Sequence, residues 1–486
     1  MKQVLSFVTG LFVVLLLGQP VLACTGVYVG KNLTEDGSTI FGRTEDLEMD
    51  HNKNLKVVEA KENKEGDILE DPSNGFQYPL PKESFKYTSL PDTTPEYGEY
   101  AEAGYNEYGV MMDATVSSYP SEDILAVDPL VEDGLAESAM TSLILPHVKT
   151  AREGIEMLAK VIDEKGAAEG NTLIIADQDE TWYMEIVSGH QYAAMKLPAD
   201  KYAVFPNSYF MGAVDPEDTE NVITSDKLIE TADQAGTLKE EEGLIKVAAS
   251  YAADIDEGTI SRYWAGVNAL NPSEEVTLDQ EEFPFLHDSQ GKISIEDIMA
   301  FQRNRFEGTD YLPSDTRASA DGGEAEDKTE DDDKTLYPIG NQNTMEAHIF
   351  QVKEDMPKEV PGIMWLSMGS PLVSPYLPVF ANITDSFEGM QVTSNEYDDT
   401  SYYWAVNKLM QTMLADEDQL KDPIRQEILS FEDAYVSDMD SFLKEIKDTF
   451  QSDKEEAAKL STDKTLQLSK EAFDLVKKLE KEYVKE

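Results

Sequence analysis

The sequence has 486 residues, of which 96 are Asp or Glu and 40 are Lys or Arg, so the formal net charge is −56 at pH 7. A surface with this charge repels nucleic acid and anionic lipid, and nucleic-acid binding is therefore excluded as the function. The hydrophobic fraction is 41%, with 22 Tyr, 18 Phe and 4 Trp. Such a chain can bury a sizeable core, which excludes an intrinsically disordered protein.

The N-terminal segment, residues 1–23, is predicted to be a secretory signal peptide. Lys2 provides a positive charge, residues 4–18 form an apolar run, and Pro20 ends that run. Val21 and Ala23 fit the small −3 and −1 positions of a cleavage site. The run is short for a membrane span and no second long apolar run follows it, so we expect a secreted bacterial protein without a membrane span. A retained membrane anchor is the alternative.

Cys24 is the only cysteine in the sequence and directly follows the expected cleavage point. One interpretation is a cell-surface lipoprotein, because residues 21–24 form a short apolar box that ends in Cys. A strand-like segment at 25–30 follows, where lipidated chains carry a flexible tether. A second interpretation is a small buried thiol, which does not explain the position. In the third, cleavage exposes an α-amine with a pKa of about 8 beside a thiol with a pKa of about 8.5, so one residue supplies base and nucleophile.

No other motif in the sequence predicts a catalytic, metal or cofactor site. The five histidines lack the spacing of metal ligands, and the sequence contains no P-loop, G-x-G-x-x-G or G-x-S-x-G motif. We therefore expect neither a metal nor a cofactor. If the α-amine were not the base, a Cys–His arrangement using His190 or His348 would be the remaining choice.

The segment after Cys24 predicts a β-hairpin that brings charged side chains back to it. Strands are expected at 27–29 and 38–42, with Asp36-Gly37 as the turn between them. Arg43 and Asp46 follow the second strand, which places them near the start of the first. A carboxylate there would hold the amine, and a guanidinium would lower the pKa of the thiol. A surface charge cluster is the competing interpretation.

Further along the chain, helical spacing of apolar residues predicts helices over 136–146 and 151–165. Residues 314–338 are polar and acidic and are predicted to form a mobile surface loop. Three strand-like runs joined by short turns predict an antiparallel meander: 172–177, 181–187 and 192–197.

The C-terminal region is predicted to be helical. Residues 402–413 share an apolar face, and Asp422 and Pro423 are expected to be the N-cap and first residue of a helix whose apolar stripe continues to 442. A last stripe covers 468–483. We expect these helices to pack on the rest of the protein, and homo-oligomerisation through them is an open alternative.

Several segments of the chain resemble one family. "CTGVYVGKNLTEDGSTIFGRTED" resembles the mature start of the cysteine dipeptidases of the dipeptidase A type, which belong to the N-terminal-nucleophile hydrolase superfamily with bile salt hydrolases and penicillin V acylases. Four later segments are similar in the same order: "GYNEYGVMMDAT", "EGNTLIIADQDETWYMEIVSG", "ISRYWAGVNALNP" and "TMEAHIFQVKEDMPKEVPGIMWLSMGSP".

The resemblance implies an α+β protein with a four-layer αββα fold built from two packed antiparallel sheets. Residues 24–395 would form the catalytic domain, and 396–486 would form a helical region packed on it.

The resemblance also implies the site. Cys24 would be the nucleophile, Arg43 and Asp46 its partners, Asn171 an oxyanion donor and Arg262 a further active-site residue. The segment "DATVSS" lacks a second oxyanion Asn found in bile salt hydrolases, so a backbone N–H would serve there. The implied substrates are dipeptides. The alternatives are a linear amide hydrolase acting on acylated amino acids, bile salts or penicillin V, and a lipid-anchored binding protein without catalysis.

Overall fold

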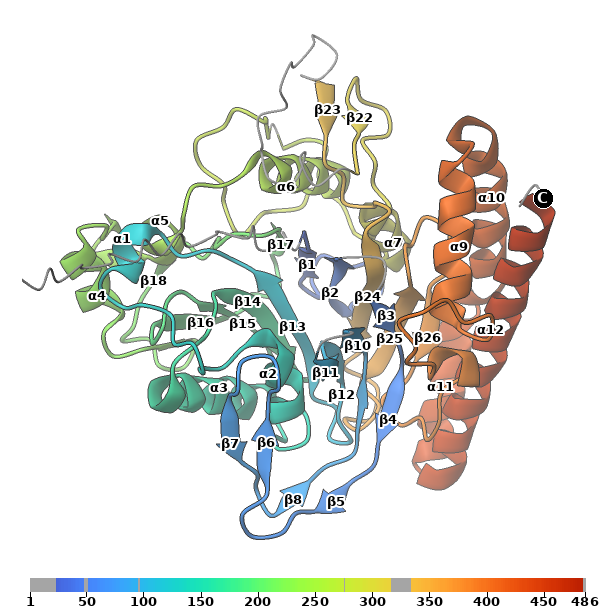
Figure 1. Ribbon diagram of the computed structural model, residues 1–486, viewed down its shortest axis with the longest axis horizontal. Coiled ribbons are helices and arrows are strands. Elements are labelled where there is room, and N and C mark those ends of the chain that lie inside the picture. The colour runs from blue at the N-terminus through green and yellow to red at the C-terminus, as the bar shows by residue number, and fades with distance from the viewer. Residues whose placement is uncertain (1–22, 48–50, 95–96, 275, 316–333, 484–486) are drawn as a thin grey trace, which may run out of the picture.

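The computed structural model describes residues 23–483 except for 48–50, 95–96, 275 and 316–333. The expected signal peptide, apart from Ala23, and most of the expected loop at 314–338 therefore lie outside the described residues. Two six-stranded sheets form the centre of the molecule, and helices lie on both sides of them (Figure 1). Within the described ranges, no helix is long and apolar enough to cross a membrane.

The first sheet contains the N-terminal hairpin and is antiparallel throughout. The predicted hairpin is confirmed: Gly37 has a φ of 76°, which glycine adopts without strain, and Gly26 pairs with Arg43. Arg43 in turn lies opposite His348 of a strand far along the chain. In spatial order the strands are β17 (Tyr202–Phe205), β1 (Thr25–Val29), β2 (Thr39–Asp46), β24 (Thr344–Val352), β25 (Gly362–Met368) and β26 (Leu377–Val379).

The second sheet contains the predicted meander, which is confirmed. Its apolar residues alternate between two faces, as expected of a strand buried on both sides. Leu173 and Ile175 point to the covering helices, whereas Ile174 points to the first sheet. In spatial order the strands are β12 (Ala103–Tyr105), β13 (Met111–Ser117), β14 (Asn171–Ala176), β15 (Thr181–Ile186), β16 (Tyr192–Lys196) and β19 (Val222–Thr224).

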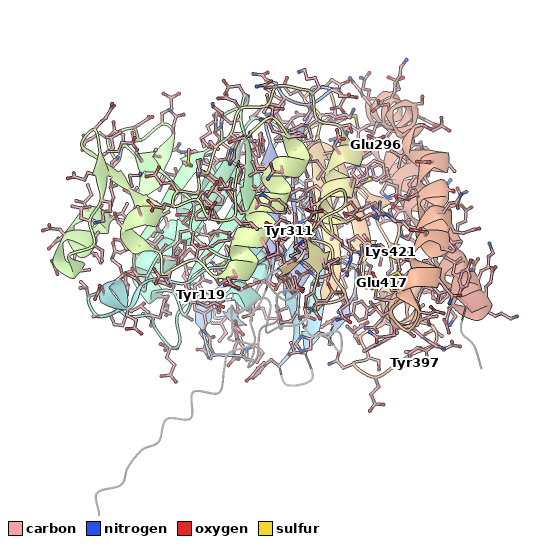
Figure 2. The ribbon with its side chains drawn as sticks, turned by 90° about the horizontal axis from the view of Figure 1, so that it is seen from above. Tyr119, Glu296, Tyr311, Tyr397, Glu417 and Lys421 are labelled. Carbon is pink, nitrogen blue, oxygen red and sulfur yellow. The ribbon has the colours of Figure 1, made fainter. Side chains whose placement is uncertain are left out.

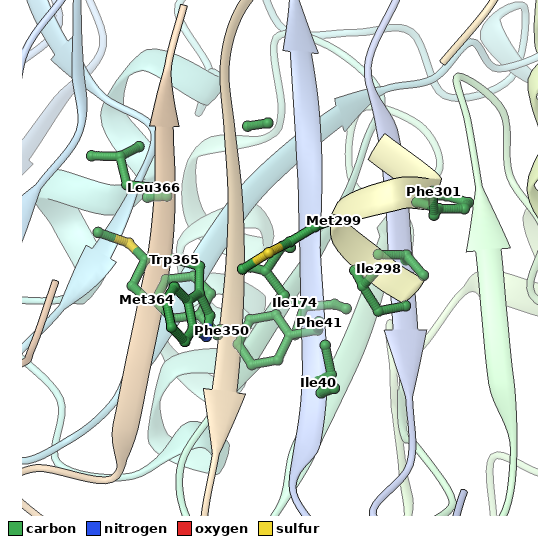
Figure 3. Packing of buried hydrophobic residues seen from close by; sticks show 14 of the residues in the cluster. Ile40, Phe41, Ile174, Ile298, Met299, Phe301, Phe350, Met364, Trp365 and Leu366 are labelled. Atoms are coloured by element: carbon green, nitrogen blue, oxygen red, sulfur yellow. The ribbon is translucent and has the colours of Figure 1, made fainter. Parts of the chain in front are cut away.

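The two sheets pack face to face between two helical layers. Helices α2 (Glu137–Ile144) and α3 (Ala151–Lys165) cover the second sheet, and α6 (Glu257–Leu270) and α7 (Ile295–Gln302) cover the first. Figure 3 shows this packing around the first sheet: Ile298 and Met299 of α7 lie beside Phe41 of β2. The predicted α+β class and four-layer αββα arrangement are confirmed.

The ends of the two predicted helices follow from local chemistry. Helix α3 spans the predicted residues because the Thr150 side chain accepts a hydrogen bond from the Glu153 N–H and Gly166 ends the helix with a φ of 76°. Helix α2 is shorter than predicted at both ends. At its C-terminus the reason is Pro146, which disfavours the helical conformation of the residue before it.

Shorter elements fill the connections between these layers. They are β3 (Asn52–Lys53), β4 (Lys56–Val58), β5 (Lys61–Glu62), β6 (Ile68–Glu70), β7 (Gln77–Pro79), β8 (Glu83–Ser84), β9 (Tyr87–Ser89), β10 (Pro91–Thr94), β11 (Gly98–Ala101), α1 (Glu122–Leu125), β18 (Ala213–Val214), α4 (Leu228–Ala235), β20 (Glu240–Glu241), β21 (Leu244–Lys246), α5 (Val247–Tyr251), β22 (Leu312–Pro313), β23 (Thr335–Leu336) and η2 (Glu388–Met390).

The C-terminal helices stand beside the β26 edge of the first sheet (Figure 1). One buried apolar cluster contains residues of both sheets and of these helices. A buried ion pair joins Arg303, after α7, to Glu432, which also accepts the Tyr376 N–H at 2.7 Å. The boundary at residue 395 stays a prediction. The helices are α9 (Tyr402–Leu414), α10 (Glu417–Val436), α11 (Met439–Phe450) and α12 (Lys454–Tyr483).

The predicted start of a helix at Asp422-Pro423 is wrong. Helix α10 begins at Glu417 and contains Pro423, and it ends before α11 instead of continuing to residue 442. Burial of Ile424 and Ile428 on the core-facing side of α10 offsets the hydrogen bond that proline removes. In the first turn Leu420 also packs on the core, and Glu417 pairs with Lys421 one turn later at 3.9 Å (Figure 2).

Candidate active site

Cys24 lies immediately before β1 and is 2% exposed. The hairpin returns the end of β2 to it, because Thr25 pairs with Thr44 and the Ala23 N–H donates to the backbone oxygen of Asp46 at 3.3 Å. Ala23 is itself buried against Tyr337. The structure thus brings Cys24 and the backbone of Asp46 together, in a form in which the nitrogen of Cys24 is still an amide.

The thiol of Cys24 is neutral at pH 7 in this form. Burial raises its pKa well above the usual range, the guanidinium of Arg43 lowers it, and the carboxylates of Glu137, Glu45 and Asp46 raise it further. Arg43 therefore acts in the direction expected from the sequence, but its effect does not win. Burial of the thiol is the largest cause, and the carboxylates that surround Arg43 act in the same direction.

Arg43 is fully buried and stands within a group of acidic side chains. Lys53 pairs with Glu45 at 2.6 Å, and His348 pairs with Glu346 at 3.0 Å. The carboxylates around Arg43 offset the positive charge of its guanidinium, and this reduces the extent to which Arg43 lowers the pKa of the Cys24 thiol. Among the described residues, five carboxylates pair with Arg43: Glu45 at 3.2 Å, Glu102 at 2.5 Å, Asp113 at 3.4 Å, Glu137 at 3.8 Å and Glu346 at 3.9 Å.

The carboxyl group of Asp46 is held by residues other than those around Arg43. It accepts hydrogen bonds from Asn341 at 2.6 Å, from Thr344 at 2.7 Å and from the Tyr337 hydroxyl at 3.5 Å. Burial raises the pKa of Asp46 to about 7, although the first two hydrogen bonds and the charge of Arg262 oppose this. A cation placed beside this carboxyl would keep it ionised at neutral pH.

Arg262 contacts the candidate nucleophile directly. It lies on α6, is 1% exposed, and donates hydrogen bonds to the backbone oxygen of Cys24, to the Thr25 hydroxyl at 3.2 Å and to the Asn207 side-chain oxygen at 2.8 Å. Its guanidinium also lies over the Tyr337 ring, 5.6 Å from the centroid. Arg262 therefore fixes the backbone on which the thiol is carried.

Asn207 is a site residue that the sequence analysis missed. It follows β17, and its amide nitrogen donates to the backbone oxygen of Ser117 at 3.0 Å while its oxygen accepts from Arg262. The available signal was a polar Pro-Asn-Ser step, starting at Pro206, within an otherwise apolar run. Asn207 links the first sheet to the end of β13.

Asn171 begins β14 and is completely buried. It lies directly opposite Ser117, so contacts lead from it through Ser117, Asn207 and Arg262 to Cys24. Asn171 lies beside the carboxyl of Glu169, yet neither polar atom of its side chain makes a hydrogen bond of ordinary geometry. A buried amide in this state is energetically costly unless a ligand satisfies it.

The two histidines considered as alternative bases, His348 and His190, are not available to Cys24. Burial lowers the pKa of His348, but the carboxylates of Glu346 and Asp113 outweigh this and raise it to about 9, so the ring is charged at pH 7. His190 lies at the surface, where it pairs with Asp128 at 2.9 Å. Within the described part of the chain, no three His, Cys, Asp or Glu side chains are grouped to hold a metal ion.

Comparison with known proteins identifies the family. The model of peptidase family C69 matches residues 23–469. A probable dipeptidase B of Streptococcus pyogenes serotype M1 is 45% identical over 468 residues, which cover 96% of this chain and 93% of the relative. A probable dipeptidase of Latilactobacillus sakei is 33% identical over 385 residues, or 79% of each chain. Among solved structures, a penicillin V acylase from Agrobacterium tumefaciens is similar with a TM-score of 0.31 and 14% identity, covering 74% of this chain and 86% of that one. The chain belongs to peptidase family C69.

Proposed function

We propose that this peptidase is a secreted cysteine dipeptidase whose nucleophile is the thiol of Cys24, exposed by removal of residues 1–23. The observation that carries the proposal is the surroundings of the only cysteine: it stands at a buried hairpin end between Arg43, Asp46 and Arg262. The relatives named as probable dipeptidases support the choice of dipeptides as substrates.

Cleavage after Ala23 changes the chemistry of the site. The amide between Ala23 and Cys24 becomes an α-amine, whose ordinary pKa is about 8. Asp46 carries a carboxyl group at this end of the hairpin, and the positive charge of the amine would lower its pKa from about 7. The same positive charge would lower the pKa of the thiol, which the uncleaved form keeps raised.

The proposed reaction moves one proton through the α-amine. The amine takes the proton of the Cys24 thiol, and the thiolate attacks the carbonyl carbon of the dipeptide. As the C–N bond breaks, the ammonium returns this proton to the leaving amine, which departs as a free amino acid. The amine then takes a proton from water, the hydroxide attacks the thioester, and the thiol is regenerated as the second amino acid leaves.

An oxyanion forms in both attack steps and needs hydrogen-bond donors. We assign Asn171 to this role because its buried amide nitrogen makes no hydrogen bond of ordinary geometry, whereas that of Asn207 bonds to Ser117. Asn171→Ala is expected to reduce kcat by about 100- to 1,000-fold with little change in KM. The measurement is steady-state hydrolysis of Ala-Ala, with Asn207→Ala as the matched comparison. A larger loss of kcat in Asn207→Ala would instead assign the role of oxyanion donor to Asn207.

The mature N-terminus and the substrate class test the whole proposal. Intact mass of protein secreted by a bacterial host should correspond to a chain that begins with unmodified Cys24, and a diacylglyceryl adduct would instead show a lipoprotein. The same preparation should hydrolyse unblocked dipeptides faster than penicillin V or a conjugated bile salt. Faster turnover of either amide would contradict the assignment as a dipeptidase.

A further inference from the structure

The acidic group around Arg43 contains more negative than positive charge. The described residues place three cations there, namely Arg43, Lys53 and His348, against the five carboxylates that pair with Arg43. Burial, Glu137 and Glu45 raise the pKa of Glu102, whereas Arg43 and Lys53 lower it. Because this buried group contains five carboxylates and three cations, a further cation bound there would be stabilised.

Glu137 is the carboxylate of this group that a ligand would reach first. Its side chain is 14% exposed, compared with 1–6% for the other four. It is also the carboxylate with the largest electrostatic effect on the Cys24 thiol. The backbone fixes its position, because the Glu137 N–H donates to Glu169 at 2.6 Å at the first residue of α2.

A second feature on the same face points to a ligand. The hydroxyl of Ser117 donates to the Glu137 carboxylate at 3.4 Å, and Ser117 lies directly opposite Asn171 across the β13–β14 pair. Directly opposed residues of an antiparallel pair project their side chains from the same face. The buried Asn171 amide, which makes no hydrogen bond of ordinary geometry, therefore faces the side on which Glu137 stands.

We propose that Glu137 binds the α-ammonium group of the substrate dipeptide, while Asn171 lies against the adjacent carbonyl group. This inference rests on the proposed dipeptidase function and names the group that sets its specificity. In a dipeptide, the ammonium nitrogen is two bonds away from the carbonyl carbon that Cys24 attacks. A single carboxylate near the thiol can therefore bind the free amine and at the same time align the scissile bond with the thiol.

With Glu137 in this role, the enzyme would require a substrate whose N-terminal amine is free. The ammonium supplies the positive charge that the acidic group lacks, and it does so where both ions are shielded from water. An N-acylated or desamino substrate brings no charge and leaves Glu137 unbalanced. The enzyme would therefore distinguish substrates by their free amine, independently of the side chains of the dipeptide.

The test compares Ala-Ala with propionyl-alanine, its analogue without the amino group, using protein that begins at Cys24. Glu137→Gln is expected to lower kcat/KM for Ala-Ala by about 10- to 100-fold and to change that for propionyl-alanine by less than about threefold. Glu137→Asp keeps the charge and should recover part of the preference for Ala-Ala. Glu132→Gln removes an exposed carboxylate shortly before α2 and should leave both substrates unaffected.

Each outcome decides one of the two proposals. If the wild type fails to hydrolyse Ala-Ala, the dipeptidase function itself is wrong. If it hydrolyses Ala-Ala but Glu137→Gln keeps the wild-type ratio between the two substrates, or loses both activities in parallel, the role of Glu137 is wrong. Should Glu137→Gln not fold, Glu137→Asp decides, since an unchanged ratio in that variant would equally overturn the inference.

Discussion

Cys24→Ala is expected to reduce dipeptide hydrolysis by about 10⁴- to 10⁶-fold, because it removes the atom that forms the covalent intermediate. The protein should be produced so that residue 24 is the first residue, since the α-amine is then present in both the variant and the wild type. The measurement is release of alanine from Ala-Ala. Cys24→Ser serves as a second variant, because it keeps a polar group at the same place but with a far weaker nucleophile.

The fold should survive this substitution. Cys24 precedes β1, and the pairing of β1 with β2 and β17 uses backbone groups that the change leaves in place. Arg262 contacts the backbone oxygen of residue 24, not its thiol. We expect a loss in the free energy of unfolding of about 1 kcal/mol, measured by denaturant titration. Wild-type turnover in a folded Cys24→Ala protein would exclude Cys24 as the nucleophile.

Blocking the α-amine is expected to have an effect as large as removing the thiol. A protein that begins at Cys24 should be active, whereas one that begins Gly-Ser-Cys24 should be inactive, because its amide nitrogen is not a base near neutral pH. The extended protein should still fold. In the structure Ala23 already precedes Cys24, packs against Tyr337 and donates its N–H to Asp46.

The comparison requires proof of both termini and of the thiol. Intact mass should verify that each protein begins as designed, and titration with a thiol reagent after unfolding should show one free cysteine in each. Equal turnover of Ala-Ala by the two proteins would mean that another group takes the proton. His348 would then have to act as a base in spite of the carboxylates that keep it charged.

Features that depend on neighbouring residues could be predicted from the sequence. The β1–β2 hairpin follows from the turn at Asp36-Gly37, and α3 follows from its apolar face and its cap at Thr150. The position of Arg43 and Asp46 near Cys24 follows from the hairpin alone. The start of α10 was missed because burial of Ile424 and Ile428, which follow Pro423, keeps the proline inside the helix.

Features that depend on the tertiary fold could not be predicted in this way. The acidic group around Arg43 takes its members from β2, the β11–β12 connection, β13, α2 and β24. In so acidic a sequence, Glu102, Glu137 and Glu346 do not differ from the many exposed carboxylates. Their burial, and the way in which their charges oppose the effect of Arg43 on the thiol pKa, appear only when the strands are placed together.

The pairing of β2 with β24 also determines when the site can form during protein synthesis. Asp46 is held by Thr344, which lies 298 residues further along the chain, and Arg43 pairs with Glu346. Ribosomes release the N-terminal hairpin long before these partners exist, and contacts of such sequence separation form late. A nascent chain therefore carries its cysteine for most of translation without the surroundings that would make it a catalyst, and the complete site can form only after residue 346 of the 486 has been added.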